Sequence, residues 1–175
     1  MKVAILIPCY GDTKAKFTNC LAAMIAHSLT ANLQDENGGK IRIQIETFMV
    51  SGSMLVESRH NLIYEAMKWG ADYALCLDAD HTFPHDTFCR LWSHNLPIVG
   101  CNYPRRFTPT SPTAATKDGL LYTTQEKAGK GLVEQCAHLG FGVLLINMKV
   151  FDTLQAYAEE HMDGNFLPLF QMARS

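Results

Sequence analysis

The sequence lacks several patterns that would assign it to common protein classes. None of its apolar runs reaches the ~20 residues that a membrane-spanning helix needs. No internal repeat or low-complexity tract is present, and the composition is ordinary for a globular protein. The formal net charge is only −2, which argues against unspecific binding to nucleic acid or to an anionic membrane. The 175 residues are therefore expected to form one domain around an apolar core.

Paired cysteines and a glycine-rich dinucleotide motif are also missing. The six cysteines include no Cys-x-x-Cys pair, and several stand inside apolar runs, as in Ala74-Leu75-Cys76-Leu77. This usage is typical of reduced, buried thiols, and the N-terminal apolar run is too short for a signal peptide, so a cytoplasmic protein is expected. No Gly-x-Gly-x-x-Gly follows the first expected strand, which argues against a Rossmann dehydrogenase.

Apolar runs alternate with segments of helical periodicity over the first hundred residues. Ser53 is a suitable N-cap for the second of the expected helices, and Gly70 suits the position just after its end. This alternation, with short connections, predicts an α/β fold with a mostly parallel sheet flanked by helices. The expected strands are 3–8, 41–50, 73–77 and 97–101, and the expected helices are 13–31, 54–69 and 84–94.

The composition changes after the fourth expected strand. Residues 102–130 are rich in Pro, Thr, Lys and Gly, which predicts a small antiparallel excursion with a short hairpin near 120–123. Further strands are expected at 133–137 and 142–146, and a helix at 148–161.

Three short polar segments each follow one of the first three expected strands. They are Pro8-Cys9-Tyr10-Gly11, Ser51-Gly52-Ser53 and Asp78-Ala79-Asp80-His81. Ligands of open α/β sheets bind outside the carboxyl ends of the strands, so these segments are expected to meet at one site.

Asp78 and Asp80 are the strongest sign of chemistry at that site. Carboxylates spaced two residues apart on extended backbone point to the same side, where they repel each other unless a cation lies between them. Mg²⁺ or Mn²⁺ suits such oxygen ligands. The alternative is a turn that caps the helix expected after Pro84.

Arg59 stands on an otherwise apolar row of the helix expected at 54–69. A guanidinium on a core-facing row needs an anionic partner, which could be Asp78 or a bound diphosphate. A purely structural ion pair is the alternative interpretation.

Three segments resemble the nucleotide-binding part of GT-A glycosyltransferases of the family 2 type, in the nucleotide-diphospho-sugar transferase superfamily, and their order and spacing match over roughly 3–103. A fourth segment resembles the later part of those enzymes, whose glycines line the acceptor side. Each segment alone is a loose motif, but all four stand in the family's order. The resemblance implies a single GT-A (Rossmann-like) domain, with 1–103 as the nucleotide-sugar-binding half and 104–175 as the acceptor side. The segments are Ile5-Leu6-Ile7-Pro8-Cys9-Tyr10-Gly11, Ser58-Arg59-His60-Asn61-Leu62-Ile63, Gly70-Ala71-Asp72-Tyr73-Ala74-Leu75-Cys76-Leu77-Asp78-Ala79-Asp80 and Gly140-Phe141-Gly142-Val143-Leu144-Leu145-Ile146.

The resemblance implies a metal-dependent glycosyltransferase, with Mn²⁺ or Mg²⁺ as cofactor and a nucleotide-diphosphate sugar as donor. Pro8 and Tyr10 would contact the base and ribose, and Arg59 would approach the base or the diphosphate. Asp78 would reach the ribose and the metal's surroundings, and Asp80 would ligate the metal directly.

Two further positions have less defined expected roles. Arg105 and its neighbour Arg106 would add positive charge for the phosphates or contact the acceptor, unless they form a solvated basic pair. His138, just before Gly140-Phe141-Gly142, would be a third metal ligand or an acceptor contact, or else a structural residue.

The chain also departs from the family pattern. No carboxylate stands in Met49-Val50-Ser51-Gly52, where family members carry an acid that holds the base. No Glu-Asp pair follows Phe151, so we expect the chain to lack the piece that supplies a general base, or to be a retaining enzyme. The acceptor stays open among glycans, proteins, small molecules and modified nucleic acid bases, and an oligomer is possible.

Two other functions compete with this hypothesis. Leu77-Asp78-Ala79-Asp80-His81-Thr82 also matches the signature of haloacid-dehalogenase-like phosphatases, in which Asp78 would be the nucleophile. In that fold, however, the signature ends the first strand rather than the third. The third hypothesis is a nucleotide-sugar-binding module without turnover.

Overall fold

The computed structural model describes residues 1–175 apart from 36, 53, 106–107, 120–132, 134 and 155–175. In the described ranges, strands and helices alternate along the first hundred residues, as the sequence predicts, and a fifth strand follows much later. The elements are β1 (Lys2–Cys9), α1 (Ala15–Thr30), β2 (Gln44–Ser51), α2 (Leu55–Trp69), β3 (Tyr73–Leu77), α3 (Thr87–Ser93), β4 (Ile98–Gly100) and β5 (Val143–Asn147).

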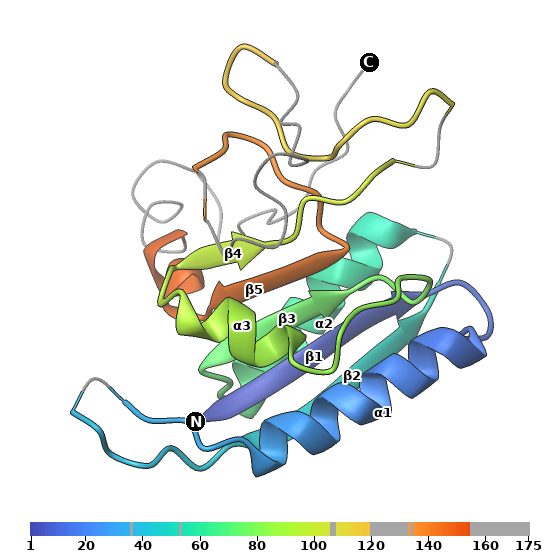
Figure 1. Ribbon diagram of the computed structural model, residues 1–175. Helices are drawn as coiled ribbons and strands as arrows, with labels where there is room; N and C mark the ends of the chain where they lie inside the picture. Colours follow the sequence, from blue (N-terminus) through green and yellow to red (C-terminus); the bar gives the residue numbers. More distant parts are fainter. Residues whose placement is uncertain (36, 53, 106–107, 120–132, 134, 155–175) are drawn as a thin grey trace, which may run out of the picture.

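The five strands form one mixed sheet in the order β2-β1-β3-β5-β4 (Figure 1). β1 runs parallel to both β2 and β3, and β5 runs antiparallel to β3 and β4. The predicted α/β fold is confirmed, and its antiparallel part is β5, inserted between β3 and β4. The register of β3 and β5 sets Val143 opposite Leu77, so the glycine before Val143 lies beside Asp78.

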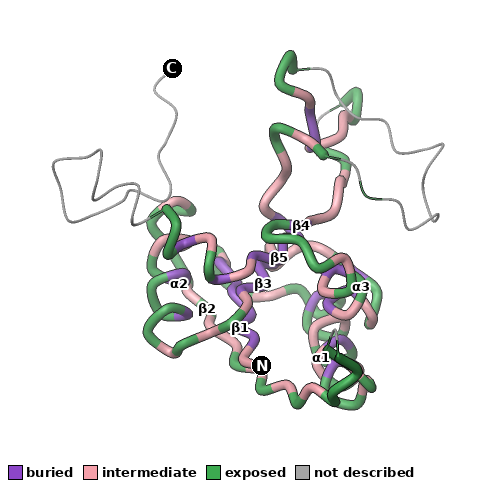
Figure 2. The backbone as a smooth tube through the Cα atoms, turned by 90° about the vertical axis from the view of Figure 1, so that its left-hand side faces the viewer, coloured by how far each residue is buried: buried purple, intermediate pink, exposed green. Residues whose placement is uncertain are grey.

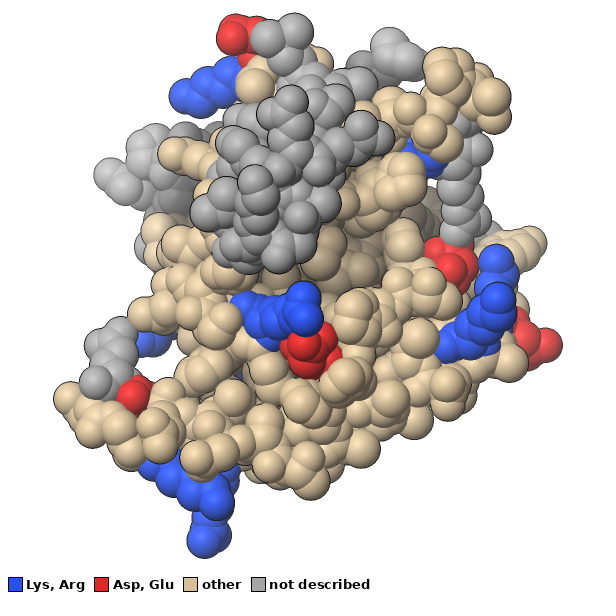
Figure 3. All heavy atoms as spheres, in the orientation of Figure 1, with Lys and Arg blue, Asp and Glu red and all other residues tan. Residues whose placement is uncertain are grey.

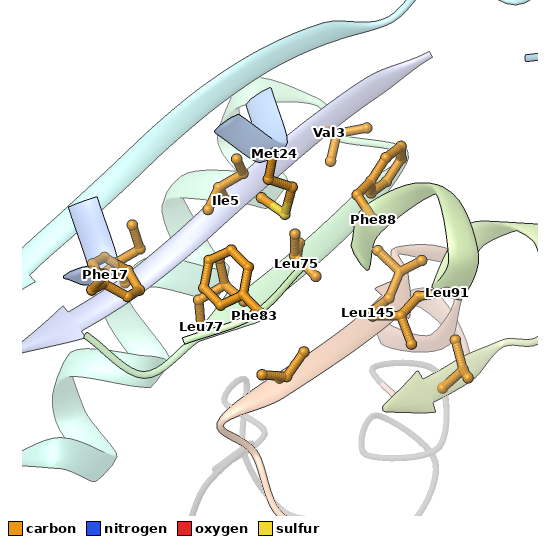
Figure 4. Close-up of a cluster of buried hydrophobic side chains, with 13 residues drawn as sticks. Val3, Ile5, Phe17, Met24, Leu75, Leu77, Phe83, Phe88, Leu91 and Leu145 are labelled. Atoms are coloured by element: carbon orange, nitrogen blue, oxygen red, sulfur yellow. The ribbon is translucent and has the colours of Figure 1, made fainter. Parts of the chain in front are cut away.

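Helices cover both faces of the sheet (Figure 2). α1 and α3 pack on one face, where Phe17, Met24 and Phe88 join Ile5 and Leu75 in a buried apolar cluster (Figure 4). On the other face, α2 contributes Leu62, Ile63 and Ala66 to a second cluster, which includes Leu6 and Leu144. Each large apolar side chain buried in this way stabilises the fold by roughly 1.5–3 kcal/mol.

The central strands have the sequences that burial on two faces requires. Every side chain from Val3 to Pro8 is buried, because β1 has a strand on each side and helices on both faces. β2, at the edge of the sheet, alternates exposed and half-buried residues instead. This difference agrees with the continuous apolar run at 3–8 and the alternating pattern at 41–50.

The ends of α2 confirm one sequence expectation and correct another. Gly70 ends the helix in the left-handed conformation at φ 75°, and its N–H bonds the carbonyls of Ala66 and Met67. The N-cap residue is Met54 rather than the predicted Ser53, which lies outside the described residues, and no side chain caps this end. The helix begins one residue later than expected because the chain is still extended at Met54.

Predictions for the second half of the chain are less accurate. The strand expected at 133–137 is wrong for the described residues 133 and 135–137, which are not in a strand. Apolar alternation forms a strand only where a neighbour pairs with it, and here the pairing reduces to an isolated bridge between Ala115 and His138. The hairpin near 120–123 lies outside the described residues. Residues 149–154 of the helix expected at 148–161 are helical, and the remainder, from 155 on, is not described.

Two surface properties bear on the class of protein. No helix in the described part of the chain has the length and apolar character needed to cross a membrane. On the face drawn in Figure 3, the described Lys and Arg side chains stand in separate small groups, several of them beside an Asp or Glu side chain. The described part of this face therefore shows no continuous basic surface of the kind that binds a nucleic acid backbone.

Candidate functional site

A cleft of about 700 Å³ lies at the carboxyl ends of the strands. It takes residues from the ends of β1 and β3, from the segments after β2 and β4, and from the start of α2. The predicted convergence of strand ends is thus present in the structure, and we call this hollow the strand-end cleft. Its lining residues are Pro8, Cys9, Tyr10, Asp12, Lys14, Gly52, Leu55, Ser58, Asp78, Ala79, Asp80, His81, Tyr103, Pro104, Arg105 and Thr113.

Asp78, the first residue after β3, is held in place by one main-chain and one side-chain hydrogen bond. Its main-chain N–H donates to the carbonyl of Gly142 at 2.9 Å, which continues the pairing of β3 with β5. Its Oδ1 accepts a hydrogen bond from Nη2 of Arg59 at 3.0 Å. The two side chains are 28% and 19% exposed, respectively, so this ion pair is largely shielded from water. One carboxylate oxygen of Asp78 is therefore committed to a cation of the protein itself.

Arg59 is held in place by an aromatic ring as well as by Asp78. Its guanidinium carbon lies 4.7 Å from the centre of the Phe141 ring, a cation–π contact. Its Nε is buried and has no hydrogen-bond partner in the described part of the chain. Asp78, one of the two anionic partners considered for Arg59, is in direct contact with it.

Asp80 and His81 follow in a tight turn rather than on extended backbone. The N–H of His81 donates to the carbonyl of Asp78 at 3.1 Å, which closes the turn. The premise that both carboxylates project from an extended strand is therefore wrong, because β3 ends at Leu77. Both carboxylates nevertheless line the strand-end cleft. The alternative of helix capping does not hold for α3, whose N-cap residue is Asp86.

Tyr103 is a cleft residue to which the sequence assigned no role. Its hydroxyl accepts a hydrogen bond from the N–H of Gly142 at 2.7 Å, and its ring meets that of His81 edge to face with 4.5 Å between centres. Burial raises the pKa of the Tyr103 phenol, so the hydroxyl stays protonated at neutral pH. The available signal was an aromatic residue directly after a predicted strand end.

Gly140 and Gly142 are glycines because Tyr103 and His81 approach their backbone closely. A Cβ on Gly140 would lie 2.5 Å from the Tyr103 hydroxyl oxygen. A Cβ on Gly142 would lie 2.3 Å from Cε1 of His81 and 2.7 Å from that same hydroxyl. All three distances are far below contact distance, so a side chain at either position would displace the rings. The two glycines therefore allow the rings to pack closely against the backbone beside the turn that contains Asp80.

The remaining predicted site residues are distributed unevenly. Pro8, Tyr10 and Arg105 line the cleft, with Tyr10 85% exposed at its rim. His138 is not among the lining residues, and its main chain pairs with Ala115. Arg106 lies outside the described residues.

The donor atoms of the cleft suit a hard cation. Within the described ranges, no three His, Cys, Asp or Glu side chains converge as a ligand group, so Asp78, Asp80 and His138 are not brought together. Two carboxylates facing an open cleft still resemble the usual Mg²⁺ arrangement, in which one or two carboxylates act with water and phosphate oxygens. The residues present thus fit a divalent ion that takes the rest of its ligands from other sources than these two side chains.

Cys76, which lies close to this site, carries a thiol that is unreactive at neutral pH. Cys76 precedes Asp78 by two residues and is fully buried within β3. Burial raises the pKa of this thiol to about 12, and the nearby Arg59 lowers it only in part. At neutral pH, Cys76 is therefore protonated and acts as an apolar core residue.

Comparisons with known proteins support the fold but do not indicate a function. No protein-family model matches the chain, and no curated protein matches it in sequence. Among solved structures, A197 from STIV is similar at 12% identity, with a TM-score of 0.54 over 90% of this chain and 71% of that one. The synthase of 4-diphosphocytidyl-2C-methyl-D-erythritol gives 13% identity and a TM-score of 0.41 over 88% and 79%. The similarity to A197 shows a shared α/β fold, and the similarity to the synthase is too weak to support any conclusion.

Proposed function

We propose that this protein is a glycosyltransferase that binds a nucleotide-diphosphate sugar and a divalent metal ion, Mn²⁺ or Mg²⁺, in the strand-end cleft. The observation that supports it best is the meeting of two carboxylates, Asp78 and Asp80, with the cations Lys14 and Arg105 around one hollow. The volume of about 700 Å³ lies within the range of small-molecule sites and has room for a nucleoside diphosphate.

The proposed donor would lie across the ends of the strands. Pro8 and Tyr10 would contact the base and ribose, and Asp78 would accept a hydrogen bond from the ribose through the oxygen that Arg59 leaves available. Asp80 would ligate the metal, and Arg105 would meet the phosphates. When bound, the metal would supply Lewis-acid stabilisation to the departing diphosphate.

Arg59 takes a different role in this proposal from the one that the family resemblance implies. Its ion pair with Asp78 and its stacking on Phe141 make it a positioning residue for Asp78 rather than a direct contact of the diphosphate. A carboxylate held in one orientation needs no reordering when a ribose hydroxyl arrives, which favours binding.

The acceptor side would be formed by 104–175, with His138 as an acceptor contact.

A transfer assay distinguishes glycosyltransfer from the two competing functions. The purified protein is incubated with Mn²⁺ and a panel of nucleotide-diphosphate sugars, with and without a mixture of small glycan acceptors, and released nucleoside diphosphate is measured. We expect release with at least one donor and its loss in Asp80→Ala.

Each competing function predicts a different result in the same samples. Metal-dependent binding without release, in every acceptor mixture, would favour a binding module over an enzyme. Covalent trapping of Asp78 by a phosphate analogue such as beryllium fluoride would favour the phosphatase.

A further inference from the structure

We propose that His81 is a protein ligand of the divalent ion, acting together with Asp80. This inference rests on the proposed function, because it presupposes that a divalent ion binds in the strand-end cleft. It replaces the expected role of His138 as a metal ligand, because His81 lines the strand-end cleft and His138 does not.

The spacing of the two side chains matches a pair of ligands. Nδ1 of His81 lies 3.7 Å from Oδ1 of Asp80. Imidazole nitrogens and carboxylate oxygens bind such ions at about 2.0–2.2 Å, so two neighbouring ligands of one ion are about 3–4 Å apart. At 3.7 Å the two atoms are too far apart for a good hydrogen bond but close enough to share an ion.

The same nitrogen is left without a hydrogen bond. Nδ1 of His81 is buried and finds no partner in the described part of the chain. A buried polar atom without a partner is costly, and native structures retain few such atoms. An ion shared with Asp80 would give this nitrogen the partner that it lacks.

The imidazole is also held in a confined position. The Tyr103 ring contacts it edge to face, and the Tyr103 hydroxyl is in turn fixed by the N–H of Gly142. The missing side chain of Gly142 leaves the space that the imidazole fills, since a Cβ there would lie 2.8 Å from Nδ1. Tyr103 is therefore a positioning residue for His81, and packing of this kind lowers the entropy lost when a ligand binds its ion.

A nitrogen ligand changes the preferred ion. A site built only of carboxylate, water and phosphate oxygens suits Mg²⁺ as well as Mn²⁺, whereas imidazole favours transition metals. With His81 in the ligand set, we expect Mn²⁺ and Co²⁺ to bind more tightly than Mg²⁺. Asp78 stays outside the direct ligands in this proposal, because Arg59 occupies one of its oxygens and the other is assigned to the ribose.

Pulsed electron paramagnetic resonance of bound Mn²⁺ tests the proposal without any activity assay. We expect a histidine nitrogen coupling in the natural protein, which changes when histidine alone is labelled with ¹⁵N. His81→Asn should abolish this coupling and weaken Mn²⁺ binding by about 10–100-fold, a loss of affinity that is typical when a residue supporting a metal site is replaced. His138→Asn is the matched control and should keep both properties.

The outcomes separate this inference from the proposed function. Asp80-dependent Mn²⁺ binding without any histidine coupling, or with a coupling that His138→Asn removes, would overturn the role of His81 and leave the metal site intact. No Mn²⁺ binding at all, even with a nucleoside diphosphate present, would count against the proposed function as well. If His81→Asn does not fold, His81→Gln is the second variant, and the absence of any ¹⁵N-sensitive coupling in the natural protein overturns the role of His81 without a variant.

Discussion

At the scale of single residues, the sequence reveals the charged members of the site but not their companions. Asp78, Asp80 and Arg59 stand out because a carboxylate pair after an apolar strand and a guanidinium on an apolar row both need partners. Tyr103 and Phe141 do not stand out, because aromatic residues are ordinary core residues in any sequence. Their roles depend on contacts made across the fold, such as the bond of Tyr103 to a glycine 39 positions away.

The ion pair of Arg59 and Asp78 should matter more for stability than an exposed pair of the same chemistry. Arg59 is 19% exposed and stacks on Phe141, so Arg59→Met breaks a pair in which both partners are largely shielded, and we expect a loss of about 1–3 kcal/mol in the free energy of unfolding. Arg90→Met is the matched control, because Arg90 bonds Asp86 at 2.6 Å but is 70% exposed. Its loss should be about 0.5 kcal/mol or less. Urea denaturation measures both, and equal losses would contradict the shielding of the Arg59 pair.

At the scale of elements, local sequence signals predict the first hundred residues well. Residues 73–77 are predicted and found as β3, and Gly70 ends α2 as expected, because apolar runs and a left-handed glycine are local properties. The insertion of β5 between β3 and β4 was not predicted. Its register is chosen by strands far away in the sequence, and no local pattern encodes that choice. The segment 140–142 reaches the site only through this pairing.

Gly142→Ala should disturb the site through packing alone. The added methyl group would meet the rings of His81 and Tyr103 at less than contact distance, so we expect a loss of about 1–3 kcal/mol in stability and weaker Mn²⁺ binding. Gly52→Ala is the comparison at the same cleft, since among the described residues its methyl group would meet Oγ of Ser58 at 3.1 Å, a tighter contact than usual but much less severe than those at Gly142. We expect it to lower stability by less than Gly142→Ala does, about 1 kcal/mol or less. Normal stability and normal metal binding in Gly142→Ala would show that the rings are not packed against this glycine.

Gly70→Ala should weaken the fold without touching the site. The residue has φ 75°, a conformation that costs a residue with a Cβ about 1 kcal/mol. A Cβ added at Gly70 would lie 3.9 Å from Nζ of Lys2, an ordinary contact, and neither residue lines the strand-end cleft. Thermal unfolding should show the loss, and nucleotide-sugar titration should give unchanged affinity. A change in affinity would mean that the end of α2 is coupled to the cleft.

At the scale of the whole molecule, helices on both faces leave the middle of the sheet closed to water, including the strand that carries Cys76. Its thiol has a pKa of about 12 in the fold against an ordinary value of 9.0. The native state therefore keeps a proton that the unfolded chain loses as the pH rises past about 9. Because ionisation then stabilises the unfolded chain and not the native state, the free energy of unfolding falls as the pH rises above about 9.

The alkaline stability of the protein should depend measurably on this thiol. Between pH 8 and pH 10, the natural protein should lose about 1 kcal/mol more of its unfolding free energy than Cys76→Ala does, because alanine has no proton to lose. The comparison is made by guanidinium denaturation at each pH, and the slopes against pH are compared rather than the absolute stabilities. Parallel slopes for the two proteins would contradict the burial of a protonated thiol.

The central claim is that Asp80 holds a divalent ion through which a nucleotide sugar binds in the strand-end cleft. Calorimetric titration with a panel of nucleotide-diphosphate sugars, with and without Mn²⁺, tests it most directly. We predict binding of at least one donor that requires Mn²⁺ in the natural protein and that is lost in Asp80→Ala, while Gly70→Ala, altered at the end of α2, binds as the natural protein does. Binding of equal strength by Asp80→Ala, or binding that does not depend on Mn²⁺, would contradict the claim.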